Sequence, residues 1–69
     1  MEKGWTKVFN DSDEYRVSIA KHLLEDHKIE SVVINHKDST YVWMGEIELY
    51  VRNEQEAQAK DVLEQLIIG

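Results

Sequence analysis

The chain has 69 residues, a formal net charge of −6 and no cysteine. A chain of this length removes only about 60% of its unfolded surface from water, so it has room for one core and a single domain, residues 1–69. The acidic balance argues against nucleic acid and anionic lipid as partners, and the lack of thiols excludes disulfides. No apolar run approaches the roughly 20 residues that span a bilayer. The amino terminus lacks a signal-peptide pattern, so we expect a soluble, cytoplasmic protein.

The first strand is predicted at residues 5–9, WTKVF, where aromatic and β-branched residues extend over a strand's length. Regular alternation would place Trp5 and Phe9 on one side of this strand and Val8 on the other.

A helix is predicted next, because Asp11 is followed three residues later by Glu14, a pattern typical of helix starts. The apolar side chains recur at helical spacing, so one side of the helix should face a core. That side comprises Val17, Ile19, Ala20, Leu23, Leu24 and His27. Lys28 follows, where glycine would more easily adopt the left-handed conformation that ends many helices.

Two further strands are predicted at residues 29–35 and 46–51. In the second of these, Ile47, Leu49 and Val51 point one way, and Glu46, Glu48 and Tyr50 the other. A second helix is predicted to begin at Asn53, with acidic residues in its first turn. Its apolar face comprises Ala59, Val62, Leu63, Leu66 and Ile67.

The element order β-α-β-β-α predicts an α+β, truncated ferredoxin-like fold. A right-handed crossover is expected to place the strand at 5–9 parallel to the strand at 46–51, which pairs antiparallel with 29–35. This gives a mixed three-stranded sheet in the order 1-3-2, with both helices on one face.

The other face of the sheet should carry apolar side chains as well, which predicts that something covers it. We expect a homo-oligomer, most simply a dimer, that buries this face or an edge strand. Alternatively, a loop or terminus folds over it and the protein is a monomer. If the face is buried, Glu46 and Glu48 need partners such as Lys7.

The connection HKDSTYVWMG, residues 36–45, holds the best candidate contact residues: Tyr41, Val42, Trp43 and Met44. Aromatic side chains and methionine provide large contact area, so these residues could bind a partner or ligand. The favoured interpretation is structural: these residues extend the hairpin or close over the core or a subunit interface. Trp5 and Tyr50 are the candidate contacts on the sheet.

The sequence offers little support for metal binding or catalysis. His22 and Asp26 share a helix face and His36 and Asp38 are close in sequence, but no spacing brings three ligands together. No nucleophile, base and acid have recognisable spacing either. We therefore expect no metal, no cofactor and no enzymatic activity.

The pattern DEYRVSIAKHLLEDHKIESVVIN, followed by a loop and GEIELYV, resembles the bacterial family named "putative prokaryotic signal transducing protein", a domain of unknown function. The resemblance covers nearly the whole chain. Family members commonly have glycine where this chain has Lys28. The family is itself similar to the ferredoxin-like PII superfamily of nitrogen-regulatory proteins.

The resemblance to PII proteins carries two expectations. In those proteins, the loop between the second and third strands contacts partner proteins, and clefts between subunits bind nucleotides. By position, residues 36–45 look like a shortened form of that loop. Nucleotide binding is not carried over, because the chain has no Gly-rich phosphate-binding turn and no basic cluster.

We therefore expect a small, non-enzymatic regulatory or protein-binding module that acts as a homo-oligomer. Residues 36–45 would be its contact site. The alternative is an effector-sensing domain that holds a small molecule in an intersubunit cleft.

Overall fold

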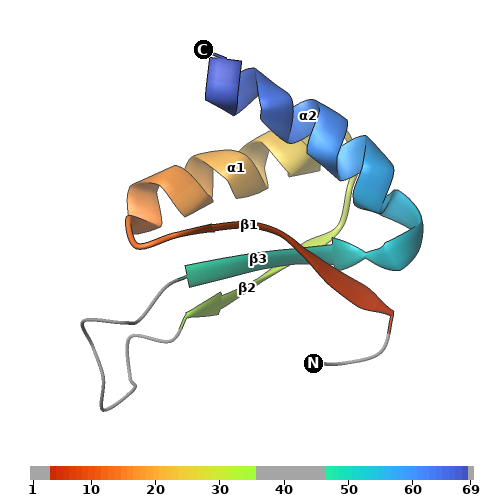
Figure 1. The fold of residues 1–69 in the computed structure, drawn as a ribbon, viewed down its shortest axis with the longest axis horizontal. Helices are drawn as coiled ribbons and strands as arrows, with labels where there is room; N and C mark the ends of the chain where they lie inside the picture. Colours follow the sequence, from red (N-terminus) through yellow and green to blue (C-terminus); the bar gives the residue numbers. More distant parts are fainter. Residues whose placement is uncertain (1–3, 36–46, 69) are drawn as a thin grey trace.

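A computed structural model describes residues 4–35 and 47–68 (Figure 1). The elements are β1 Trp5–Asp11, α1 Glu14–Asp26, β2 Ser31–Asn35, β3 Ile47–Arg52, the 3-10 turn η2 Asn53–Gln55 and α2 Glu56–Ile68. The predicted β-α-β-β-α order is confirmed, with element ends shifted by a few residues. Both helices lie on one face of the sheet, as expected (Figure 1).

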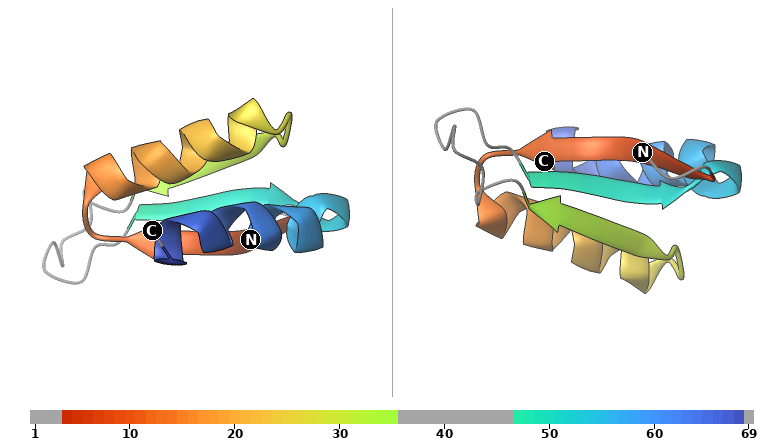
Figure 2. Two further views of the ribbon diagram at one scale, coloured as in Figure 1. Left: turned by 90° about the horizontal axis from the view of Figure 1, so that it is seen from above. Right: turned by 90° about the horizontal axis from the view of Figure 1, so that it is seen from below.

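The strand order β1-β3-β2 is also as predicted, but the sheet is not mixed. β3 pairs antiparallel with both β1 and β2. The predicted parallel pairing is wrong because the crossover through α1 joins β1 to β2, so these two strands are the parallel ones, and β3 separates them. Seen from above the helices, α2 lies over β1 and α1 over β2 (Figure 2).

A bulge in β1 decides which way its aromatic residues face. The pairing register shifts between Lys7 and Phe9, which makes Val8 an additional residue in the strand. Phe9 therefore lies on the helix side, packed against the core, whereas Trp5 pairs with Arg52 on the opposite side. The prediction that both aromatic residues share one side is wrong because it assumed uninterrupted alternation.

The core fills the space between the sheet and the two helices. Its buried residues come from α1, α2, β3 and the end of the α1–β2 connection: Val17, Ala20, Leu24, Ile29, Ile47, Leu49, Val51, Ala59, Val62 and Leu63. Ile19 is 38% exposed and His27 is also exposed, so their predicted place in the core is wrong. The side of α1 that meets the sheet is narrower than the apolar arc. The side chain of Ile67 lies outside the described residues.

The first helix is capped two residues later than predicted. Asp13 is the N-cap, and its Oδ1 accepts a hydrogen bond from the backbone N–H of Tyr15 at 2.9 Å. Asp11 belongs to β1, and its Oδ1 accepts from the backbone N–H of Asp13 at 2.9 Å. By accepting these backbone hydrogen bonds, the two carboxylates stabilise the connection between β1 and α1. At the second helix, the predicted start at Asn53 begins the turn η2 instead.

The end of α1 has the hydrogen bonds of a Schellman motif. The N–H of Ile29 donates to the carbonyl of Leu24 and the N–H of Lys28 to that of Glu25, both at 2.9 Å. Lys28 takes the left-handed conformation, with φ of 61°. Leu24 and Ile29, the two apolar residues that the motif brings together, are both fully buried. The position that favours glycine is therefore occupied by a lysine.

Lys28→Gly is expected to raise the free energy of unfolding by about 0.5–1 kcal/mol, because a left-handed lysine carries a steric cost that glycine avoids. Urea denaturation of both proteins measures the difference. Lys28→Ala is the control, since alanine shares the cost, and it should give no gain. A loss of stability in the glycine variant would contradict this account of the helix end.

Candidate interaction surfaces

The sheet face turned away from the helices is the first candidate surface. We call it the open face; the register places on it Trp5, Lys7 and Asn10 of β1, Val32 and Ile34 of β2, and Glu48, Tyr50 and Arg52 of β3. No helix among residues 4–35 and 47–68 covers it (Figure 2, right). Alternation along β3 produces this division, because Ile47, Leu49 and Val51 point into the core.

A cation connects the two edge strands across one end of the open face. The guanidinium carbon of Arg52 lies 4.6 Å from the centroid of the Trp5 ring, within cation–π range. The Nε atom of the same arginine is 3.6 Å from Oε1 of Glu30, just before β2. Trp5, Arg52 and Glu30 thus join β1, β3 and the start of β2.

A second network lies next to it along β3. Glu48 Oε2 is 3.4 Å from Lys7 Nζ, and its Oε1 accepts a hydrogen bond from the Tyr50 hydroxyl at 2.7 Å. The predicted partnership between Glu48 and Lys7 is therefore confirmed. The hydrogen bond to Glu48 is the main cause that raises the pKa of Tyr50, and burial and the carboxylate charge add to it. Glu48 uses both oxygens to hold neighbours in place.

The apolar part of the open face lies on the edge strand β2. Val32 is 41% exposed, and Ile34, two residues further on, is half-buried. They pair directly with Tyr50 and Glu48, so aliphatic side chains lie beside the hydrogen-bonded pair. The surface therefore combines exposed apolar area with charges that are already partnered within the chain.

The structure brings the two predicted sheet contacts, Trp5 and Tyr50, to the same face. They belong to adjacent strands, and Tyr50 is the more buried, with 7% of its surface exposed. The predicted contacts of the connecting segment, Tyr41, Val42, Trp43 and Met44, lie outside the described residues, as does Glu46.

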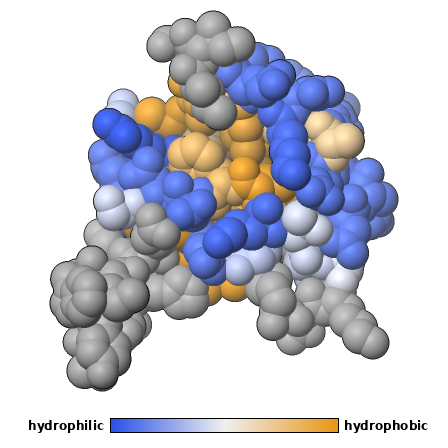
Figure 3. All heavy atoms as spheres, in the orientation of Figure 1, coloured by the Kyte–Doolittle hydropathy of each residue, from blue (hydrophilic) through white to orange (hydrophobic). Residues whose placement is uncertain are grey.

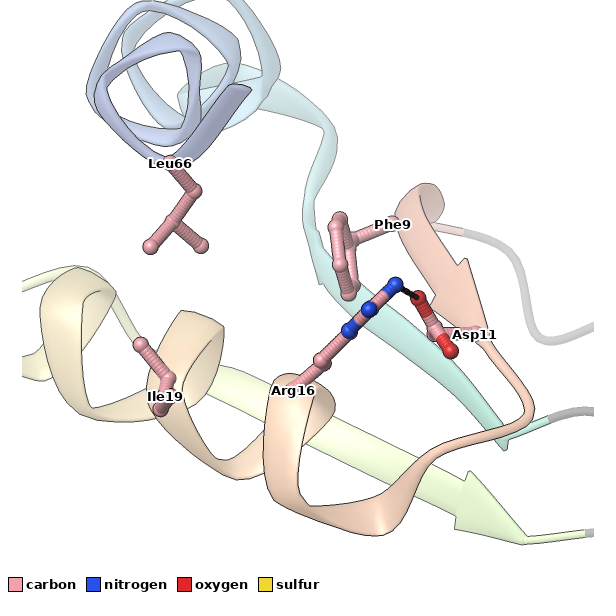
Figure 4. Close-up of a pocket in the computed structure, with 5 residues that line it drawn as sticks. All are labelled: Phe9, Asp11, Arg16, Ile19 and Leu66. Atoms are coloured by element: carbon pink, nitrogen blue, oxygen red, sulfur yellow. Dashed lines mark ion pairs between the residues drawn. The ribbon is translucent and has the colours of Figure 1, made fainter. Parts of the chain in front are cut away.

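The second candidate surface is a hollow between the two helices that the sequence analysis missed. It has a volume of about 290 Å³ and is lined by Phe9, Asp11, Arg16, Ile19 and Leu66. Ile19 and Leu66 point toward one another from α1 and α2, and Arg16 reaches past Phe9 toward Asp11, with 3.6 Å between Nη1 and Oδ2 (Figure 4). The sequence signal for this hollow was the position of Ile19 at the margin of the amphipathic arc of α1. An apolar side chain at such a margin can face either the core or water.

The described residues offer no metal site. Within residues 4–35 and 47–68, no group of three or more His, Asp or Glu side chains is placed to hold an ion. His27 Nδ1 lies 3.0 Å from the carbonyl of Leu23, a bond local to the end of α1. His36 and Asp38 fall outside the described part of the chain.

A scan of family models matches residues 5–67 to the family described as "putative prokaryotic signal transducing protein". The chain belongs to this family. The match spans all the described strands and the residues of both candidate surfaces. Searches of curated proteins and of solved structures find no match. None of the helices in the described part of this family member is long and apolar enough to cross a membrane.

Tyr50→Phe is expected to lower the free energy of unfolding by about 1 kcal/mol at pH 8, because it removes a hydrogen bond to a carboxylate. A raised pKa in the folded state means that this stabilisation is complete below about pH 10, the unfolded value, and is lost as the pH rises through the raised pKa. Urea denaturation between about pH 8 and 11 should therefore show the two proteins converging. A constant difference over this range would contradict the linkage.

Proposed function

We propose that this protein is a small, non-enzymatic regulatory module of a signalling system that self-associates through its open face. The observation that carries the proposal is the composition of that face. It exposes Val32 and part of Trp5 and Ile34, while the helices cover only the other side of the sheet. A layer with apolar groups on both faces gains from a second layer.

The charges of the open face favour a second copy of this chain as that layer. The two cations of the open face, Lys7 and Arg52, are paired with Glu48 on the same face and with Glu30 just before β2, so these four groups together carry no net formal charge. Two such faces can meet about a two-fold axis without adding like charge to the interface. The pairs within each copy remain intact, which avoids the cost of burying an unpartnered ion.

The segment 36–45 is included in the proposal as a further contact site, on the composition of its sequence alone. Tyr41, Trp43 and Met44 are residue types that contribute strongly to protein interfaces. The segment joins the two strands that hold the apolar side of the open face.

Sedimentation velocity over about 1–200 µM tests the proposal, and Val32 and Val33 provide matched variants. These neighbours on β2 are 41% and 38% exposed but face opposite sides of the sheet. The unmodified protein is expected to dimerise. Val32→Lys should weaken the dimer by about tenfold or more, whereas Val33→Lys should leave it unchanged.

Circular dichroism confirms that each variant is folded before its association is compared. Trp43→Ala is a further variant for the same experiment. It should also weaken association if the segment 36–45 is part of the interface. A protein that stays monomeric at every concentration overturns the proposal. Equal effects of the two valine variants would place the interface elsewhere.

A further inference from the structure

The hollow between α1 and α2 is part of a longer groove. A second hollow of about 410 Å³ shares Ile19 and Leu66 with the first and continues along α1 to His22, Leu23 and Asp26. Its wall includes Tyr15, whose side chain is 72% exposed. In the space-filling view, hydrophobic residues gather between the two helices and hydrophilic residues surround them (Figure 3).

The groove has the length and spacing that a helical segment requires. Its wall on α1 runs from Tyr15 to Asp26, which corresponds to about 16 Å, or three helical turns. Tyr15, Ile19 and Leu23 recur every four residues along this wall and form one apolar ridge. Such a ridge packs against an apolar stripe of a second helix.

The net charge of the two helices and of the residues that flank them indicates what charge a partner of the groove should carry. Residues 11–28 and 53–68, which contain both helices, hold nine Asp or Glu and four Lys or Arg, a formal charge of −5. Arg16, the cation at one end of the groove, lies 3.6 Å from Asp11 and 3.9 Å from Asp13, so two carboxylates offset it. Neither helix has a basic residue in its last turn to balance the negative end of its dipole.

We propose that the groove between α1 and α2 binds a basic amphipathic helix of a partner protein. The apolar side of that helix would lie on Ile19, Leu23 and Leu66, and its Lys and Arg residues would face the carboxylates of the helix layer, among them Asp26 at the groove wall. A second copy of this chain fits the groove poorly, because it would bring two acidic helix layers together. The groove and the open face therefore select different partners, and the two proposals are independent.

Fluorescence anisotropy with a labelled synthetic peptide tests the inference. The probe is a helix of about 14 residues with leucine on one side and lysine on the other. Two control peptides keep its length: one has the same residues reordered so that leucines surround the helix, and the other has glutamate in place of lysine. The basic amphipathic peptide is expected to bind at least about tenfold more tightly than either control.

Variants of the protein distinguish peptide binding in the groove from non-specific attraction to the acidic surface. Ile19→Ser should weaken binding of the basic peptide by about fivefold or more. Val33→Ser is the matched control, because both residues are 38% exposed and Val33 lines a separate hollow. Tyr15→Ser is a second groove variant at a site too exposed to threaten folding. Equal binding by all variants would mean non-specific charge attraction and would overturn the inference, as would equal affinity for the reordered peptide. The oligomeric state of the same samples reports on the open face independently.

Discussion

The structure depends on the burial of one side of β3 beneath both helices. Ile47, Leu49 and Val51 are at most 2% exposed, and they belong to the core that fills the space between the sheet and the two helices. Because side chains alternate along a strand, burial of these three obliges Glu48, Tyr50 and Arg52 to point the other way. The open face is therefore a consequence of how the core is built, and its charges are held by partners in the sheet or, for Arg52, by Glu30 just before β2.

The same division separates two kinds of surface. On the open face, cations and carboxylates are matched, so apolar contact can take place without a large electrostatic cost. On the helix side, carboxylates outnumber cations, and Asp11 and Asp26 are among the residues that line the apolar groove between the helices. The bulge at Val8 serves both surfaces, since it leaves Trp5 on the open face and turns Phe9 to the groove. Under the two proposals, this member of the signal-transducing family joins self-association to recognition of a second protein.

Sequence patterns were sufficient for the element order, the strand order and most of the core, because amphipathic periodicity reports burial directly. They failed where a local feature changed the period or the register. The bulge at Val8 has no glycine to reveal it, and Asp11 and Asp13 are equally good caps until the end of β1 is known. Ile19 lies at the margin of the α1 arc, where only the angle between helix and sheet decides its exposure. Because Ile19 was predicted to lie in the core, the groove that it lines was not predicted from the sequence.

Native-state hydrogen exchange of the β3 amides tests most directly whether this strand holds the molecule together. The account predicts that the amides of Leu49 and Val51 exchange only through global unfolding, while amides of the edge strands β1 and β2 exchange earlier through local opening. If the β3 amides opened at a lower free energy than those of the helices, the central role of this strand would be contradicted.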